Sequence, residues 1–519
     1  MKTFLLLLTA VLLLKSGDET SWTTYGKNYA GWRYSELTQI NPGTLSRLAP
    51  KWIFQTRAPS GMETTPLIQD GIMYVTGTSN HAWAIDLKSG KALWHYSKTP
   101  KKPLDLCCGE VNRGFAIAGD RLFKVNIEDT LVALDRLSGR VLWEVELGDY
   151  RKGYSGTVAP LVVRNLVVVG TAGAEFGIRG FVDAYDAATG KRVWRFYTIP
   201  MPGEPGGETW GSSAGASPNL RGGGSTWITG TYDPELNLIY WGTGNPGPDM
   251  NGDVRPGDNL YTCSLVALDA DTGKLKWHFQ FTPHDVHDWD AIGDPVLVDL
   301  KINGAVRKAV VQANRNGHYY ALDRTNGKLL FVKPYTKVSW TKDFSADGRP
   351  VLVPGQEPRE EGTLACPGLG GGHNWNATTY SPRTGWHYFS SEDGCHMFYR
   401  TEQQFVEGQW YQLSTVDWVK GEANKKSVVA VDASTGQVQW RRELAATPSG
   451  GMLSTASDLL FYGDSAGNLV ALNARTGEPR WHFPTGSAIS APPVTYEFEG
   501  KQYISVASGN LVITFALID

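Results

Sequence analysis

Apolar and polar positions recur in the same order at seven places along the chain. In each copy an apolar strand end leads to a polar residue, Asp in most copies, then to a turn that closes on Gly, and then to a strand that ends in an aromatic residue. Asp offers an acceptor to the turn amides, and Gly takes a positive φ. Each copy predicts a hairpin of the last two strands of a sheet, with its aromatic docked on the neighbouring sheet. The copies are AIDLKSGKALW (84–94), ALDRLSGRVLW (133–143), AYDAATGKRVW (184–194), ALDADTGKLKW (267–277), ALDRTNGKLLF (321–331), AVDASTGQVQW (430–440) and ALNARTGEPRW (471–481).

The spacing of these copies indicates the architecture. The terminal aromatics of the first three copies lie 49 and 51 residues apart, which suits one four-stranded propeller blade per copy. Gaps of 83 and 109 residues follow the third and fifth copies, and the second gap holds a degenerate copy, TYSPRTGWHYF (379–389). Segment KWIFQT (51–56) is predicted to close the ring against the last blade. Seven clear copies and one degenerate copy predict an all-β, eight-bladed β-propeller with tryptophan-docking repeats, with seven blades as the alternative.

Composition agrees with many short strands and tight turns. Charged residues make up 19% of the chain, below the usual quarter, while Gly (59) and Trp (19) are abundant. The formal net charge is −3 and Lys and Arg are scattered, so a nucleic-acid-binding surface is not expected. No Pro/Ser-rich linker divides the chain, and the Gly-rich stretch 202–224 is interpreted as a loop on one face. We therefore expect a single domain over residues 18–519.

The first residues are typical of an export signal. An apolar run from Phe4 to Leu14 follows an early lysine; it is too short to span a bilayer but suits the apolar region of a secretory signal. Lys15 and Ser16 replace the small-x-small pattern of a good cleavage site, and no Cys follows for a lipid anchor. We expect a signal peptide over residues 1–17 and a periplasmic protein, in a compartment where disulfides form.

Two of the five cysteines, Cys107 and Cys108, are adjacent in CCGEVNRG (107–114). Adjacent Cα atoms lie about 3.8 Å apart, whereas an ordinary disulfide needs roughly 4.4–6.8 Å. A bond between the two would form a strained eight-membered ring, and strain of that kind persists at functional sites. The alternatives are two unrelated thiols or two halves of separate bridges, and the spacing alone favours these alternatives.

Five motifs in order along the chain carry a resemblance to a known family. They are CCGEVNRG (107–114), GAEFGIRG (173–180), GTGNPGP (242–248), HDVHDWDA (284–291) and NRNGHYYALDRTNGK (314–328). Together they resemble the pyrroloquinoline quinone (PQQ)-dependent alcohol dehydrogenases, the methanol/ethanol dehydrogenase family of eight-bladed quinoproteins. The resemblance implies that a ring formed by Cys107 and Cys108 covers one face of the flat cofactor and that Trp227 stacks on the other face. For Trp227 the alternative is another aromatic between blades.

PQQ carries three carboxylates, so its binding requires guanidinium and hydroxyl groups. The further cofactor contacts that the resemblance implies are Glu63, Arg113, Thr157, Asn374 and Trp375. Arg113 would pair with a carboxylate and Thr157 would donate from its hydroxyl, whereas Glu63 beside an anion needs a shared proton or an intermediary. The chain departs from the family at Ala172, where a hydroxyl residue is common, so one hydrogen bond to the cofactor is expected to be absent.

Hard oxygen donors in three separate segments predict a metal site. Glu175, Asn245 and Asp288 suit an ion such as Ca²⁺, which takes six to eight oxygen ligands. Asp290 lies two residues past Asp288, so both carboxylates should point to one side of an extended segment. By resemblance, an Asp at that offset marks the lanthanide-dependent branch, and a further anionic ligand favours a 3+ ion, so a lanthanide is preferred. Related sugar quinoproteins carry a similar D-x-D without lanthanides, so Ca²⁺ stays as the alternative.

The remaining histidines and cysteines are less informative. His284 and His287 form an H-x-x-H pair that zinc could use, but no third or fourth ligand is evident, so we interpret them as residues at the rim of the site or behind its ligands. The separation of Cys366 and Cys395 resembles a structural disulfide of the family. Cys263 then remains as a free core thiol.

The resemblance also implies roles in a reaction. Asp288 would take the hydroxyl proton of an alcohol as hydride passes to PQQ, and Arg315 would hold the quinone oxygen. The chain contains no C-x-x-C-H haem motif, so electrons are expected to leave to a separate, soluble cytochrome c. The predicted function is a periplasmic quinoprotein that oxidises small alcohols to aldehydes. The alternatives are a quinoprotein for sugars or bulky secondary alcohols, and a non-enzymatic propeller scaffold.

Overall fold

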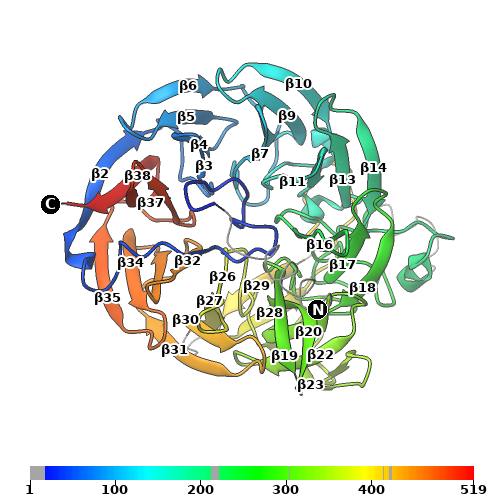
Figure 1. The fold of residues 1–519 in the computed structure, drawn as a ribbon. Helices are drawn as coiled ribbons and strands as arrows, with labels where there is room; N and C mark the ends of the chain where they lie inside the picture. The colour runs from blue at the N-terminus through cyan, green and yellow to red at the C-terminus, as the bar shows by residue number, and fades with distance from the viewer. Residues whose placement is uncertain (1–17, 212–220, 303, 413, 420–423, 519) are drawn as a thin grey trace, which may run out of the picture.

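The computed structural model describes residues 18–211, 221–302, 304–412, 414–419 and 424–518. The predicted signal peptide, residues 1–17, lies outside them. Figure 1 shows sheets that follow one another around a ring in chain order. The helices of the described part are 3-10 turns: η1 (Leu45–Arg47), η2 (Tyr150–Lys152), η3 (Ala174–Phe176) and η4 (Gly207–Trp210). In that part of the chain no helix has the length and apolar character to cross a membrane. The fold is an all-β propeller.

Most sheets contain four antiparallel strands that are consecutive in the chain. In the first part of the chain the sheets are β3 (Leu67–Gln69), β4 (Ile72–Thr76), β5 (Ala82–Asp86), β6 (Ala92–Tyr96); β7 (Ala116–Ala118), β8 (Arg121–Asn126), β9 (Thr130–Asp135), β10 (Val141–Glu146); β11 (Leu161–Val163), β12 (Leu166–Gly170), β13 (Phe181–Asp186), β14 (Arg192–Tyr197); β15 (Thr231–Asp233), β16 (Leu238–Gly242), β17 (Ser264–Asp269), β18 (Leu275–Gln280); and β19 (Val296–Ile302), β20 (Ala305–Ala313), β21 (His318–Asp323), β22 (Leu329–Pro334). Neighbouring sheets share their buried side chains, as Val125 of β8 and Val168 of β12 do.

The later sheets are less regular. They are β26 (Thr379–Ser381), β27 (Trp386–Asp393), β30 (Lys425–Asp432), β31 (Val438–Leu444); β32 (Met452–Thr455), β33 (Leu459–Gly463), β34 (Asn468–Asn473), β35 (Pro479–Pro484) with β1 (Tyr34–Ser35) added in parallel; and β36 (Val494–Phe498), β37 (Lys501–Ser508), β38 (Leu511–Leu517) with β2 (Leu48–Gln55). Two smaller sheets pair β23 (Thr341–Phe344) with β24 (Pro350–Leu352), and β25 (Thr363–Ala365) and β29 (Ser414–Trp418) with β28 (His396–Arg400). A disulfide, Cys366–Cys395, joins the ends of β25 and β28.

The repeat hairpins form as the pattern predicts. In the second copy the Asp135 carboxylate accepts from the amide and the hydroxyl of Ser138 at 2.8 and 2.6 Å, and Gly139 has a φ of 71°. Trp94 of the preceding copy lies against Gly139, where a Cβ would come within 2.7 Å of the indole, and its Nε1 donates to the carbonyl of Arg136 at 3.0 Å. The same bond to the next copy is made by Trp143, Trp194, Trp277 and Trp440.

The ring closes where β2 pairs with β38, as predicted for residues 51–56 (Figure 1). The prediction that residues 379–389 mark a separate blade is wrong. These residues form β26 and β27, the first hairpin of the sheet whose last hairpin is the 430–440 copy. Among the described sheets of four or five strands, the one that lacks a repeat copy is the closing one. Because its outer strand comes from the other end of the sequence, it needs no turn between its last two strands.

Strand direction determines which segments meet on each face of the ring. Successive strands of a sheet run antiparallel, so the turn between the third and fourth strands, which carries the repeat, lies on one face. The turn between the second and third strands and the connection to the next sheet lie on the opposite face. Every predicted site residue falls in one of these two kinds of segment. The topology therefore gathers them on one face, away from the repeat turns.

Candidate functional site

A cavity of about 290 Å³ lies among these inter-strand segments. The predicted site residues that line it are Glu63, Cys107, Cys108, Arg113, Thr157, Glu175, Trp227, Asp288, Asp290, Arg315, Asn374 and Trp375. Asn245 does not line the cavity, but its backbone amide donates to Asp290 Oδ1. Residues from widely separated parts of the sequence are thus brought together around one volume.

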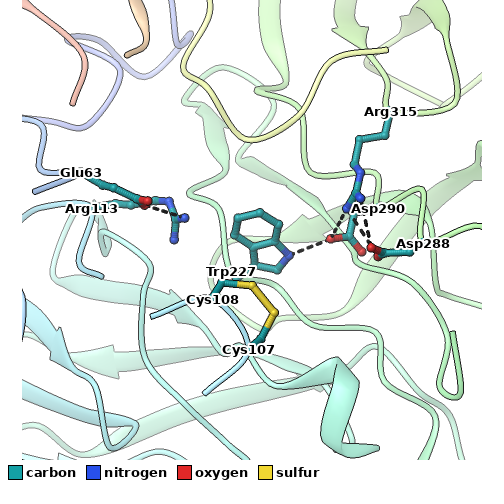
Figure 2. Close-up of a disulfide and its surroundings, with 8 residues drawn as sticks. All are labelled: Glu63, Cys107, Cys108, Arg113, Trp227, Asp288, Asp290 and Arg315. Carbon is teal, nitrogen blue, oxygen red and sulfur yellow. Dashed lines mark hydrogen bonds and ion pairs between the residues drawn. A yellow bond between two sulfur atoms is a disulfide. The ribbon is translucent and has the colours of Figure 1, made fainter. Parts of the chain in front are cut away.

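Cys107 and Cys108 are bonded to each other, and both line the cavity (Figure 2). This is the pairing that the resemblance implied and that the spacing alone did not favour. A carboxylate oxygen of Glu175 lies within 4.8 Å of both sulfur atoms. Because sulfurs in a disulfide are not thiolates, this group is not a metal site of its own. The bridge forms part of the cavity wall beside Glu175.

Trp227 connects two charged groups of the site. Its Nε1 donates to Asp290 Oδ2 at 3.0 Å, and the Arg113 guanidinium carbon lies 4.9 Å from its ring centroid. The same guanidinium lies 5.3 Å from the ring centroid of Trp375. In Figure 2 the Glu63–Arg113 pair is seen on one side of Trp227 and the Asp288–Asp290–Arg315 group on the other. Its contacts fix the indole plane at the cavity wall.

Arg113 pairs with Glu63 at 2.8 Å, and both side chains are largely buried. Burial raises the pKa of Glu63, although the Arg113 charge opposes this. Nε and Nη1 of Arg113 and the hydroxyl of Thr157 are buried without a hydrogen-bond partner in the described part of the chain. Buried donors are almost always satisfied. Unsatisfied donors around a cavity therefore indicate a ligand that carries several acceptors, such as carboxylates.

An acidic group lies at the other end of the cavity. Arg315 contacts Asp288 Oδ2 at 3.1 Å and Asp290 Oδ2 at 3.2 Å, so the two carboxylates do share one side of their segment. Asp288 has a φ of 59°, a conformation that is strained for most residues. Burial raises the pKa of Asp288 well above its ordinary range; Arg315 opposes this, and the charges of Asp290 and Glu175 add to it. Burial also raises the pKa of Glu175 to about 7.

These carboxylates are short of positive charge. Among the residues that the structure describes, Glu175, Asp288 and Asp290 face a single guanidinium, that of Arg315. Buried charges require partners or a metal ion. Hard carboxylate and amide oxygens, with Asn245 beside them, are the ligands that Ca²⁺ and similar cations take. The donor set therefore fits a multivalent cation.

The structure also shows groups that the sequence reasoning missed. Asp249 is buried and accepts a hydrogen bond from Nδ2 of Asn245 at 2.8 Å. Burial raises its pKa, and the charges of the other acids raise it further. Ser155 and Ser225 line the cavity with hydroxyl groups. Each serine lies two positions before a predicted residue, Thr157 or Trp227, and a period of two would have placed it on the same side of an extended segment.

The remaining sequence predictions concern Ala172 and two histidines. Ala172 lines the cavity and presents no hydroxyl. His287 Nε2 contacts the carbonyl of Gln356 at 2.9 Å, and the ring stacks on Trp289. His284 Nδ1 contacts the carbonyl of Gly257 at 2.7 Å. Each ring is thus held by a backbone carbonyl of a different segment, and in the described part of the chain neither histidine belongs to a group of three or more possible metal ligands.

Comparison with known proteins identifies the family. Residues 22–343 match the PQQ family described as "Glucose/ethanol/alcohol dehydrogenase, beta-propeller domain". Residues 424–518 match the family described as "Outer membrane protein assembly factor BamB".

The chain is also similar to named proteins over most of its length. It is 38% identical to quinohemoprotein alcohol dehydrogenase ADH IIB of Pseudomonas putida, over 94% of this chain and 73% of that protein. It is 35% identical to the lanthanide-dependent methanol dehydrogenase of Methylacidiphilum fumariolicum, over 97% of this chain and 88% of that protein. The solved europium-containing methanol dehydrogenase superposes with a TM-score of 0.90 at 32% identity, over 98% and 100% of the two chains. Together with the cavity geometry, these matches show that the chain belongs to the PQQ-dependent alcohol dehydrogenase family.

Proposed function

We propose that this protein is a periplasmic quinoprotein that oxidises small alcohols to aldehydes, with PQQ and a metal ion bound in the cavity. The observation that supports this most directly is that one cavity combines unsatisfied hydrogen-bond donors with uncompensated negative charge. Arg113 and Thr157 present buried donors without partners, and Glu175, Asp288 and Asp290 present more negative charge than Arg315 balances. A tricarboxylate ligand would accept hydrogen bonds from these donors, and a multivalent cation would balance the negative charge.

The cofactor would lie between two flat, rigid surfaces. The Cys107–Cys108 bridge would cover one face of the PQQ ring and Trp227 the other, because both line the cavity. The disulfide bond fixes the bridge, and a hydrogen bond to Asp290 fixes the indole of Trp227. Glu63, Arg113 and Thr157 would hold its carboxylate edge, and Asn374 and Trp375 would contact it from the rim. Bound PQQ supplies a quinone that accepts hydride from the alcohol carbon.

The metal ion would be held by Glu175, Asn245, Asp288 and Asp290. We propose that it is a lanthanide rather than Ca²⁺, because the second aspartate of the D-x-D pair lies within the same charged group. The similarity to a lanthanide-dependent methanol dehydrogenase supports this preference.

Asp288 would act as the base that takes the alcohol's hydroxyl proton. A base must lie within hydrogen-bond reach of the proton that it takes, and Asp288 lines the cavity in which the cofactor and the alcohol would bind. Arg315 would remain paired with the carboxylates at one side and hold a quinone oxygen at the other, stabilising charge as it develops.

Further parts of the proposal concern the whole protein. We propose eight blades for the single domain of residues 18–519, which the sheets of four or five strands support. Residues 1–17 would direct export to the periplasm. We propose that electrons pass to a separate, soluble cytochrome c. Oxidation of sugars or bulky secondary alcohols is the alternative for the same site.

Reconstitution tests the proposal. Purified protein is loaded with PQQ and either La³⁺ or Ca²⁺ and assayed with an artificial electron acceptor on methanol, ethanol, a bulky secondary alcohol and glucose. We expect PQQ-dependent oxidation of the small alcohols, fastest with La³⁺. Asp290→Ala should lose the La³⁺-dependent activity, whereas Asp271→Ala, at an exposed repeat turn, should keep it. Unchanged La³⁺ activity in Asp290→Ala would exclude the metal assignment, and preference for glucose would favour the alternative.

A further inference from the structure

Asp249 is a buried carboxylate with an unsatisfied oxygen. Only 1% of the residue is exposed, and Oδ2 has no hydrogen-bond partner in the described part of the chain. It lies four residues after Asn245, in the segment between β16 and β17. The cofactor roles proposed above do not involve it. A buried, unpaired carboxylate is destabilising unless something compensates its charge.

The partner of Asp249 is the proposed metal ligand Asn245. Nδ2 of Asn245 donates to Asp249 Oδ1 at 2.8 Å and to the carbonyl of Pro246 at 3.2 Å. Both hydrogen bonds use the amide nitrogen, so the amide oxygen is left for another partner. Its backbone amide donates to Asp290 Oδ1, which places the residue beside the acidic group. Asp249 thus holds the Asn245 side chain in the orientation that a metal ligand needs.

The Arg255 guanidinium lies close to Asp249 but forms no hydrogen bond with its carboxylate. Arg255 is buried, and it donates hydrogen bonds to the carbonyls of Pro248, Asp249 and Asp285 and to the side chain of Asn259. None of these bonds reaches the Asp249 carboxylate. Burial raises the pKa of this carboxylate, and the charges of Asp288, Glu175 and Asp290 add to the effect. Asp249 therefore belongs to the same buried acidic group as these residues, and repulsion within that group favours a highly charged cation.

We propose that Asp249 is a positioning residue of the metal centre: it orients the Asn245 amide oxygen toward the ion and adds a further negative charge that favours a trivalent over a divalent cation. This inference rests on the proposed function, because it requires the metal centre. Residues behind metal ligands orient them, and their replacement typically lowers metal affinity by roughly 10–100-fold. Charge removal should weaken binding of a 3+ ion more than that of a 2+ ion.

The test separates orientation from charge. Asp249→Asn keeps an acceptor oxygen and removes the charge, whereas Asp249→Ala removes both. Asp253→Asn is the matched control, because Asp253 lies in the same segment with an exposed side chain paired to Arg400. Dissociation constants for La³⁺ and for Ca²⁺ are measured by calorimetry on the PQQ-loaded proteins, and thermal unfolding is measured on the metal-free proteins.

Metal affinity is expected to fall in the Asp249 variants, whereas the metal-free stability of Asp249→Asn is expected to stay the same or rise. Asp249→Asn should raise the La³⁺ dissociation constant about tenfold, Asp249→Ala up to about 100-fold, and each should raise the Ca²⁺ constant less. The metal-free Asp249→Asn protein should unfold at the same or a higher temperature, because one like charge is removed. An unchanged La³⁺/Ca²⁺ ratio, or a parallel fall in metal-free stability, would overturn this inference alone. Wild-type protein that binds neither ion would overturn the proposed function as well.

Discussion

The two faces of the propeller treat the same residue type in opposite ways. On the face of the repeat turns, Asp135 accepts from the amide and hydroxyl of Ser138, and these bonds lower its pKa. On the other face, Asp288 is buried among acids, its pKa is raised, and its backbone has a positive φ. The repeat turn satisfies its own polar groups, whereas the cavity leaves polar groups that only a ligand satisfies. This contrast separates structural from functional positions.

The largest effect is expected on the cavity face. Asp288→Asn removes the proposed base and should lower kcat roughly 10²–10⁴-fold. The metal-free variant should unfold at the same temperature as metal-free wild type or at a higher one, because Asp290 and Glu175 lose a repelling neighbour. Steady-state kinetics on PQQ-loaded protein, with metal content measured in parallel, checks the prediction. Activity within tenfold of wild type would contradict the role of Asp288.

A substitution on the repeat face should show the reverse pattern, with lower stability and unchanged activity. Trp143→Ala removes an indole that packs on Gly190 and donates to the carbonyl of Ala187. The loss should lower the free energy of unfolding by about 3 kcal/mol, with kcat per folded molecule unchanged. Denaturant unfolding measures the first quantity and active-site titration the second. Trp410→Ala, at a half-exposed tryptophan outside the repeat, is the control and should change stability less.

The effect that is smallest for each pH unit tests an exception to the contrast. Lys124 is a buried cation in the regular strand β8, and burial lowers its pKa from 10.5 to about 7. Between these values the unfolded chain binds the proton that the folded chain has lost. This group should therefore make stability rise with pH from about 7 to about 10, by up to about 1.4 kcal/mol per pH unit. Lys124 sharpens the comparison, because its charge is buried in a regular strand and no ligand compensates it there.

Urea unfolding of wild type and Lys124→Met at pH 7 and pH 9 isolates this contribution. The difference between the two proteins should shrink as the pH rises, since wild-type Lys124 is neutral at the higher pH. A difference that does not depend on pH would show that Lys124 is not the titrating group.

The repeat face was predictable because each copy is locally complete. Asp, Gly and Trp stand at fixed offsets, and each makes its contact within one turn or with the next copy. The blade assignment for residues 379–389 failed because the same phrase also fits a first hairpin, and periodicity does not state which hairpin of a sheet it marks. The closing sheet carries no copy, so periodicity did not identify it, and only its outer strand was predicted, from residues 51–56.

The cavity face was predictable only through resemblance. Spacing alone favoured two unrelated thiols or two halves of separate bridges for Cys107 and Cys108, although the two bond to each other. Asp249 was missed because nothing local distinguishes an acid that pairs across a loop from one that faces solvent. Its role depends on Asp288 and Glu175, which come from other segments of the ring. Contacts of that kind follow from topology and not from neighbouring residues.

The pairing of β2 with β38 has a consequence for biogenesis. These strands come from opposite ends of the sequence, so the ring stays open until nearly all of the domain has left the ribosome and, as proposed, crossed the inner membrane. Before that moment both strands present unpaired edges, which are prone to join other chains. Assembly of the cavity face would then be a late event, and the open ring would have to avoid pairing with other chains before a ligand enters.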